Sequence, residues 1–230
     1  MALTPITWDD TGKRFYETGV DHGVLYVYNS VTSKYENGVA WNGLTAVTES
    51  PSGAEPTALW ADNIKYANLV SAEEFGGTIE AYTYPDEFMA CDGFAQISED
   101  GAGIVVGQQN RTTFGMAYRT LIGNDTESTD HGYKIHLLYG CLASPSEKAY
   151  ATVSDSPEAI TFSWEFTTTA INVPGMKATA CITIDSRTTD PTVLQKIEDA
   201  LYGTNVSTTN MAESPYLPTP AELIAFLSEE

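Results

Sequence analysis

ITFSWEFT, residues 160–167, alternates apolar and polar side chains without a break. Successive side chains of an extended chain point to opposite faces, so the apolar residues of this stretch share one face. They are Ile160, Phe162, Trp164 and Phe166. The pattern predicts a strand with one buried face. We expect Trp164, which lies between two phenylalanines on that face, to anchor the core and not to hold a ligand.

Similar β-rich runs lie along the rest of the chain, separated by clusters of Gly, Asn, Asp and Pro. They are Gly23–Tyr28, Val39–Thr48, Ile64–Ser71, Thr78–Tyr84, Thr112–Ile122, Tyr133–Leu142 and Thr179–Asp185. Short strands at this spacing favour a β-sandwich or barrel over parallel βαβ units. The sequence therefore predicts a mainly β (α+β) fold with a β-sandwich or barrel core.

One amphipathic helix is predicted after the last of these strands. Asp190 can cap it, Pro191 suits its first position, and Gly203 can supply a left-handed stop. Its apolar residues fall on one face, namely Val193, Leu194, Ile197 and Leu201. We expect this helix to flank the sheet.

A second, shorter helix is predicted near the end of the sequence. Thr219, followed by Pro220 and by Glu222 three positions on, forms a capping-box pattern before an apolar run. The polar, proline-bearing stretch TNVSTTNMAESPYLP, residues 204–218, separates this helix from the first. We therefore predict that residues 204–230 form a C-terminal arm that reaches away from the core.

Two other segments are expected to form arms. Residues 1–21 show little periodicity, and Ser50–Thr57 (SPSGAEPT) is expected to be a long Pro/Gly loop between two strands. A chain of 230 residues with 42% hydrophobic content can form one large domain. The expected organisation is an N-terminal arm (1–21), a β-sandwich domain (22–203) and a C-terminal arm (204–230).

The charge balance is strongly acidic. The sequence has 11 Lys and Arg against 31 Asp and Glu, a formal net charge of −20, and no basic run. Tight binding of nucleic acid requires clustered basic residues, so this composition disfavours it. An acidic surface suits a channel past which DNA slides without adhering, but simple solubility would account for the same charge.

Residues that could carry catalysis are scarce. The sequence lacks a phosphate-binding glycine loop, a nucleophile elbow and an H-E-x-x-H zinc motif. His22 and His131 each stand beside a glycine and suit turns, and His136 suits a strand; no two of them have the spacing of a shared metal site. Three acidic pairs suit solvated turns better than a glycosidase cleft, namely Glu73–Glu74, Asp86–Glu87 and Glu99–Asp100. We expect no catalytic, cofactor-binding or metal-binding residues, and a protein that is not an enzyme.

The three cysteines give no sign of a disulfide scaffold. Cys91, Cys141 and Cys181 lie far apart among apolar or small neighbours, which predicts buried, reduced thiols in a reducing cytoplasm. No apolar run approaches the roughly 20 residues of a membrane span, and MALTPITWDD lacks the regions of a secretory signal. We expect neither classical export nor a membrane anchor.

Long phrases of the sequence resemble the major tail proteins of long-tailed bacteriophages of Gram-positive hosts. These phrases are WDDTGKRFYETGVDHGVLY (8–26), the stretch from VAWNG to YPDEF (39–88), the stretch from FGMAY to FSWEFTT (114–168) and ITIDSR (182–187). They cover nearly the whole chain in the expected order. The stretch after Gly203 is the least diagnostic.

This resemblance implies the subunit of a tail tube, with a β-sandwich or barrel core flanked by a helix. In such tubes, protomers form hexameric rings that stack, and their sheets line a lumen for the genome. The implied partners are copies of itself and other tail proteins; DNA passes through without specific binding, and no cofactor or membrane is involved. The implied location is the virion tail, assembled in the host bacterial cytoplasm. Contacts between rings need extended elements, for which Met1–Asp21, Ser50–Thr57 and Thr204–Glu230 are the candidates.

Two alternatives remain open. A monomeric β-sandwich module that binds carbohydrate or a cell surface would use aromatic platforms, and the sequence has 13 Tyr and 4 Trp. However, Trp41, Trp60 and Trp164 lie in strand-like runs, where burial is expected. A glycoside hydrolase is the second alternative.

Overall fold

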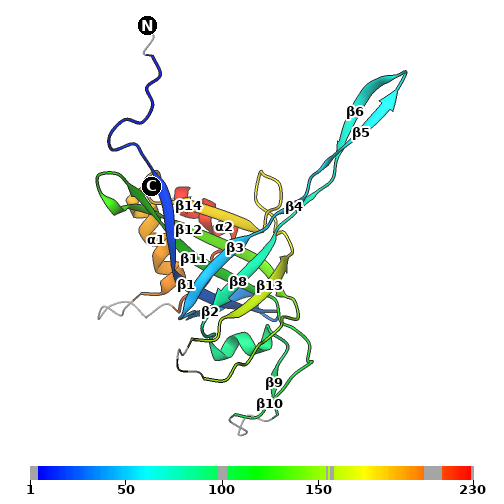
Figure 1. The fold of residues 1–230 in the computed structure, drawn as a ribbon, viewed down its shortest axis with the longest axis vertical. Helices are drawn as coiled ribbons and strands as arrows, with labels where there is room; N and C mark the ends of the chain where they lie inside the picture. Colours follow the sequence, from blue (N-terminus) through cyan, green and yellow to red (C-terminus); the bar gives the residue numbers. More distant parts are fainter. Residues whose placement is uncertain (1–4, 98–102, 154, 156–157, 205–213, 229–230) are drawn as a thin grey trace.

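The structure, a computed structural model, describes residues 5–97, 103–153, 155, 158–204 and 214–228 (Figure 1). It is 46% strand and 13% helix, which confirms the predicted mainly β fold. The main antiparallel sheet contains β1 (Tyr16–Asn29), β2 (Lys34–Ala40), β3 (Leu44–Glu49), β8 (Gly76–Ala81), β11 (Phe114–Asn124), β12 (Ser128–Ala143), β13 (Phe162–Thr168) and β14 (Cys181–Asp185). Its order is β2-β1-β11-β12-β13-β8-β3, and β14 also pairs with β12.

Shorter elements project from this sheet or cover it. The minor strand pairs are β4 (Ser52–Gly53) with β7 (Glu73–Glu74), β5 (Pro56–Ala61) with β6 (Ile64–Val70), and β9 (Ala95–Gln96) with β10 (Val105–Val106). The helices are the 3-10 helix η1 (Asp86–Ala90), α1 (Pro191–Tyr202) and α2 (Pro220–Ser228).

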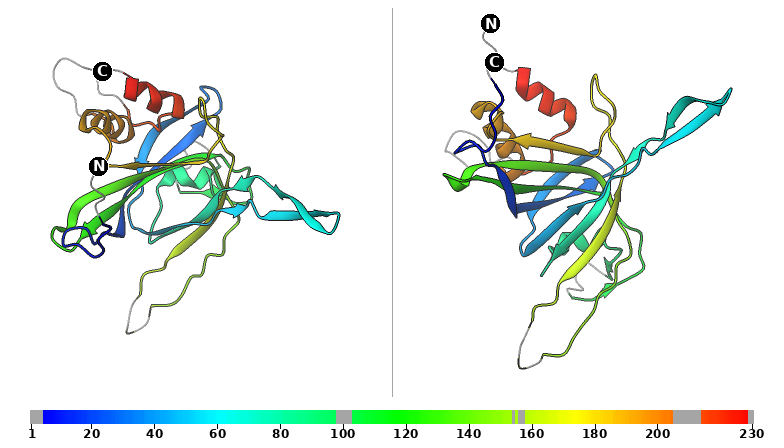
Figure 2. Two further views of the ribbon diagram at one scale, coloured as in Figure 1. Left: turned by 90° about the horizontal axis from the view of Figure 1, so that it is seen from above. Right: turned by 45° about the horizontal axis from the view of Figure 1, so that its top comes forward.

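The main sheet folds into two layers where β12 changes partner. Residues 134–138 of β12 pair with β14, whereas residues 141–143 pair with β13. Between them lies Gly140 with a φ of +62°, and a Cβ atom there would lie 2.2 Å from the carbonyl oxygen of Thr169. Only glycine fits this backbone approach. The layer β13-β8-β3 thus packs over the layer β2-β1-β11-β12-β14 (Figure 2).

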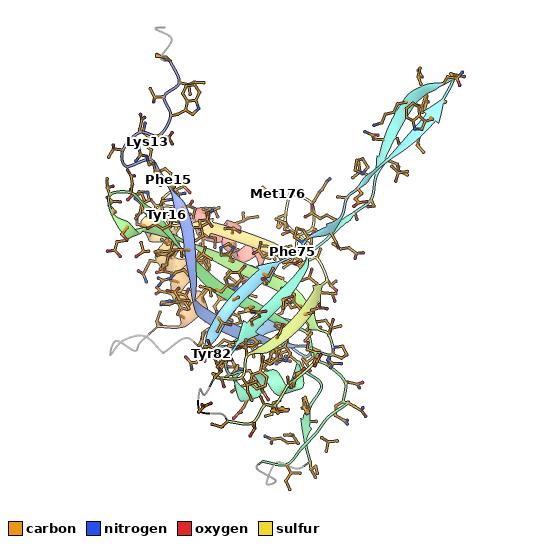
Figure 3. All side chains as sticks on the ribbon, in the orientation of Figure 1. Lys13, Phe15, Tyr16, Phe75, Tyr82 and Met176 are labelled. Carbon is orange, nitrogen blue, oxygen red and sulfur yellow. The ribbon has the colours of Figure 1, made fainter. Side chains whose placement is uncertain are left out.

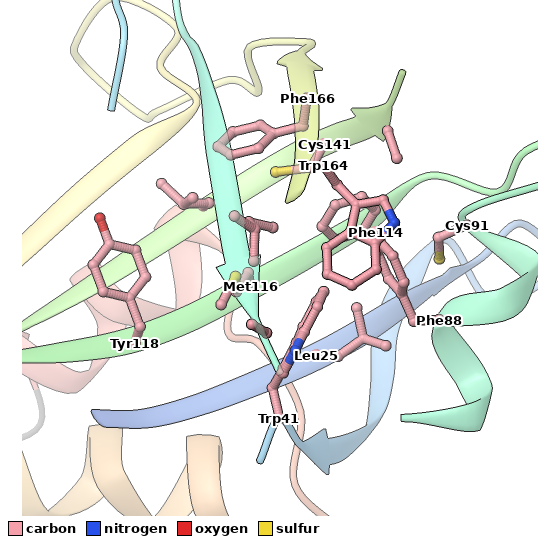
Figure 4. Close-up of a cluster of buried hydrophobic side chains, with 14 residues drawn as sticks. Leu25, Trp41, Phe88, Cys91, Phe114, Met116, Tyr118, Cys141, Trp164 and Phe166 are labelled. Carbon is pink, nitrogen blue, oxygen red and sulfur yellow. The ribbon is translucent and has the colours of Figure 1, made fainter. Parts of the chain in front are cut away.

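The first core lies between these two layers (Figure 4). Trp164 is 0% exposed, as predicted, and its ring packs against those of Trp41 and Phe88 at centroid distances of 5.7 and 5.2 Å. The indole nitrogen of Trp41 donates a hydrogen bond to the Thr83 carbonyl at 3.0 Å. Aromatic rings from β13, from η1 and from the residue after β2 thus pack together in this core.

The second core lies on the other face of the β1-β11-β12 layer, which the two helices cover (Figure 2). Alternation along β1 sends Tyr26 to this face and Leu25 to the first core. The Tyr26 hydroxyl donates to the carbonyl of Leu201 on α1 at 2.7 Å, and the Tyr139 hydroxyl donates to the Pro218 carbonyl at 2.8 Å. These bonds satisfy the polar tips of buried tyrosines.

Both predicted helices and their N-terminal caps are confirmed. Asp190 accepts a hydrogen bond from the backbone N–H of Thr192 at 2.8 Å, and Gly203 has a φ of +77°. In the capping box, the Thr219 N–H donates to Glu222 Oε2 at 2.7 Å and the Glu222 N–H donates to Thr219 Oγ1 at 3.3 Å.

The predicted C-terminal arm is wrong for the residues that the structure describes. Residues 214–228 return to the body, because Leu217 and Leu223 are buried in the second core. The Leu217 N–H donates to the Tyr35 carbonyl at 3.0 Å. The remainder of the predicted arm, residues 205–213 and 229–230, lies outside the described residues.

The predicted N-terminal arm is shorter than expected. Strand β1 begins at Tyr16, which pairs with Gly123, so residues 16–21 belong to the sheet. Residues 5–15 have no regular secondary structure, and residues 1–4 of the predicted arm lie outside the described part of the chain.

Candidate assembly surfaces

A long hairpin formed by β5 and β6 projects from one end of the body (Figure 1). Its two-residue turn is Asp62–Asn63, with φ values of 52° and 62°. Positive φ at both turn positions is the geometry of a tight type I′ hairpin. The predicted loop Ser50–Thr57 is therefore wrong: it contributes β4 and the start of β5, because the chain doubles back at this turn and pairs with Ile64–Val70.

The β5–β6 hairpin carries large apolar side chains in contact with solvent. They are Leu59, Trp60, Ile64, Tyr66, Leu69 and Val70. Trp60 is 69% exposed, so its expected burial is wrong; its strand belongs to a two-stranded ribbon, which has no core to enter. Figure 3 shows side chains along this ribbon with no other element beside them. Because an isolated two-stranded hairpin is marginally stable in water, such a surface suits a contact with another molecule.

The N-terminal segment, residues 5–15, is anchored at one end and apolar at the other. The Gly12 N–H donates to Asp125 Oδ1 at 2.9 Å, and the Phe15 ring stacks on His131 at 5.0 Å. Beyond these contacts, Ile6 and Trp8 are exposed. The segment runs away from the sheet (Figure 1), so two large exposed apolar residues lie outside the body.

The end of the body opposite the β5–β6 hairpin carries two loops with exposed apolar residues (Figure 1). The β9–β10 loop, residues 93–111, exposes Ile97, Ile104, Val105 and Val106. The connecting segment, residues 144–161 between β12 and β13, exposes Tyr150 and Val153. The two ends of the molecule thus both carry apolar projections, on different elements.

A polar cluster surrounds Glu49, the residue at which the chain leaves the main sheet toward the β5–β6 hairpin; we call this point the root of the hairpin. The Tyr118 hydroxyl on β11 donates to Oε1 of Glu49, the last residue of β3, at 2.5 Å. The His136 ring on β12 stacks on Tyr118 at 4.7 Å, and its Nδ1 lies 3.5 Å from Glu49 Oε1. His136 and Tyr118 hold the pKa of Glu49 below its usual range, and burial together with Glu49 raises the pKa of Tyr118.

The other two histidines have separate surroundings. His22 has a φ of +50° and lies beside Asp21, whose carboxylate accepts two hydrogen bonds from Arg119. His131 Nδ1 lies 2.5 Å from Glu127 Oε2. Among the residues that the structure describes, no group of three or more His, Cys, Asp or Glu side chains could hold a metal ion.

The three cysteines have perturbed thiols, and two of the three acidic pairs lie at the described surface. Burial raises the pKa of Cys91 to about 12 and that of Cys181 to about 11, and it raises the pKa of Cys141 as well, so these thiols stay protonated near neutral pH. The Glu73–Glu74 and Asp86–Glu87 pairs are exposed, on β7 and η1, and Glu99–Asp100 lies outside the described residues.

Comparison with known proteins gives no independent identification: no protein-family model matches the sequence, and no curated protein matches it. In the described part of the chain, neither α1 nor α2 is long and apolar enough to cross a membrane.

Proposed function

We propose that this protein is the repeated subunit of a bacteriophage tail tube, the function that its resemblance to major tail proteins implies. The observation that carries the proposal is the β5–β6 hairpin, whose exposed Trp60, Tyr66 and Leu69 have no core to enter. Such a hairpin gains stability when another molecule covers it.

A second copy of the same chain is the partner that best suits this surface. The hairpin projects at one end of the body, and the apolar β9–β10 loop and connecting segment project at the other (Figure 1). A contact between two different surfaces of one protein is head-to-tail, and it generates rings or open filaments. Repetition of such contacts would build stacked rings, for which the resemblance implies hexamers.

Unpaired strand edges support lateral assembly. Within the described residues, β3 pairs with β8 alone and β14 pairs with β12 alone. Edge strands with free backbone groups are places where a neighbouring copy can extend a sheet. In the proposed tube, the net charge of −20 lies on the bore and the outer surface, where it keeps DNA from adhering and avoids the subunit contacts.

The test is removal of the hairpin without disturbance of its root. Because Gly53 pairs with Glu73, replacing residues 54–72 by Asn-Gly closes a two-residue turn on the β4–β7 pair. We expect this variant to fold and to stay monomeric in light scattering while the full chain assembles. A variant that assembles as well as the full chain would contradict the proposal.

One observation favours the alternative, a module that binds carbohydrate or a cell surface: Trp60 and Tyr66 are exposed. Aromatic side chains of this kind can stack on sugar rings. Such a module would remain a monomer at all concentrations and would lose glycan binding when Trp60 is replaced by Ala.

A further inference from the structure

A buried ion pair connects the roots of the two loops opposite the hairpin. Lys148 lies in the connecting segment, and Asp92 directly precedes the β9–β10 loop. Nζ of Lys148 lies 2.5 Å from Oδ2 of Asp92. The two side chains are only 16% and 4% exposed. Buried charges of this kind depend on one another, because removal of one partner leaves the other unpaired in a poorly solvated place.

Aromatic rings surround the ammonium group of Lys148. Its Nζ lies 4.8 Å from the ring centroid of Phe94, 5.3 Å from that of Tyr84 and 6.0 Å from that of Trp164. A cation within about 6 Å of an aromatic face is attracted to it, and the attraction is stronger away from water. The ammonium group of Lys148 is therefore surrounded by one carboxylate and three aromatic rings.

The groups that form this site come from three parts of the chain. Phe94 belongs to the β9–β10 loop, Lys148 to the connecting segment, and Trp164 to the centre of the first core. The root of the β9–β10 loop is closed by a bond from the Gln109 N–H to the Gly93 carbonyl at 3.0 Å. The Arg111 side chain adds a bond to the Asp92 carbonyl at 3.2 Å.

The connecting segment is longer than the connection between its two strands requires. Strands β12 and β13 are antiparallel neighbours, with Ala143 opposite Phe166, and a few residues suffice for such a connection. The chain uses residues 144–161 instead, and no regular strand or helix is present in its described residues. Among the described residues of this segment, Lys148 forms an ion pair with the body.

We propose that Lys148 is a clamp that couples the connecting segment to the β9–β10 loop, so that the two loops are ordered or released together. The clamp works through the Asp92 carboxylate and the Phe94 ring, which both lie at the root of the β9–β10 loop. It is independent of the tail-tube proposal, because it operates within one subunit.

Hydrogen exchange on the full-length chain tests the coupling. In the Lys148→Met variant we expect amide exchange to accelerate at least tenfold in residues 144–153 and also in residues 93–97 and 103–109, with α1 unchanged. The matched control is Lys177→Met, which removes an exposed lysine and should change neither loop. Acceleration confined to the connecting segment would overturn the proposal.

A second variant covers the case in which the unpaired Asp92 unfolds the protein. The double variant Asp92→Asn/Lys148→Met leaves no unpaired charge, so it should fold and still show faster exchange in both loops. Chemical rescue adds a direct readout: propylammonium, which matches the atoms that Lys148→Ala removes, should restore protection in both loops of that variant, and sodium at equal concentration should not. Rescue of one loop alone, or unchanged exchange of either loop in the double variant, would contradict the clamp.

Discussion

The hydroxyl group of Tyr118 donates a hydrogen bond to Oε1 of Glu49, and this bond ties the middle of β11 to the last residue of β3. The chain leaves the body for the β5–β6 hairpin directly after Glu49, through Ser50 and β4. The residue from which the chain leaves the main sheet is thus held by a side-chain contact with β11. The proposed assembly surface and the core are physically connected at this point.

Removal of the Tyr118 hydroxyl should weaken this root. We expect Tyr118→Phe to lower the free energy of unfolding by about 1–2 kcal/mol, since it leaves a partly buried carboxylate oxygen short of a donor. Urea unfolding followed by tryptophan fluorescence measures the change. Tyr82→Phe, at an exposed position, is the control and should have no measurable effect. If Tyr118→Phe and Tyr82→Phe are equally stable, the bond between Tyr118 and Glu49 does not stabilise the folded protein.

The contribution of Glu49 should depend on pH in one direction. The folded state holds its pKa below the usual value of 4.5, mainly through His136. A carboxyl with a depressed folded pKa stabilises the protein above its unfolded pKa and loses that effect as the pH falls through the folded pKa. Glu49→Gln should therefore be less stable than the natural protein at pH 6, and the difference should shrink below pH 4.5. A difference independent of pH would contradict this assignment.

Two tryptophans should give opposite results. Trp164→Ala should cost about 3–5 kcal/mol in unfolding free energy, as for other fully buried aromatic residues. Trp60→Ala, on the exposed hairpin, should change the stability of the monomer by less than about 0.5 kcal/mol but prevent assembly. Chemical unfolding and light scattering on both variants separate the roles. Loss of binding to a ligand in Trp164→Ala, without loss of stability, would refute its role in the core.

Local sequence signals were sufficient for most strands of the main sheet, for the N-terminal helix caps and for the burial of Trp164, although the predicted run Val39–Thr48 is divided between β2 and β3. Each of these depends on alternation or on residues within one turn, and both are visible in the sequence. The return of the C-terminal segment was missed because the bond between Leu217 and Tyr35 joins residues far apart in the chain. The same reason hides the site around Lys148, whose partner Asp92 is distant in sequence.

The hairpin was missed for a different reason. Its signal was present, since Asp62–Asn63 separates two β-rich runs by the two residues of a tight turn. The proline and glycine residues of Ser50–Thr57 suggested a loop instead. The wrong prediction that Trp60 is buried has the same origin. A strand in a two-stranded ribbon has no buried face, so Trp60 is exposed.

Assembly should be more efficient at higher salt. Copies that each carry a net charge of −20 repel one another, and salt screens this repulsion over about 10 Å at 0.1 M and over shorter distances at higher concentrations. We expect the fraction of assembled protein in sedimentation to increase as sodium chloride rises from roughly 0.05 to roughly 0.5 M. This range includes the concentration of about 0.1 M at which screening acts over about 10 Å. A decrease over this range would indicate that attractive ion pairs dominate the contacts.

The most direct test of the central proposal is electron cryomicroscopy of the purified full-length protein at high concentration. We expect stacked rings that form tubes, with β5–β6 hairpins in the contacts between subunits and acidic side chains along the bore. A protein that stays monomeric at every concentration and salt level, or tubes whose bore is lined by Lys and Arg, would contradict it, because basic residues there would hold DNA phosphates.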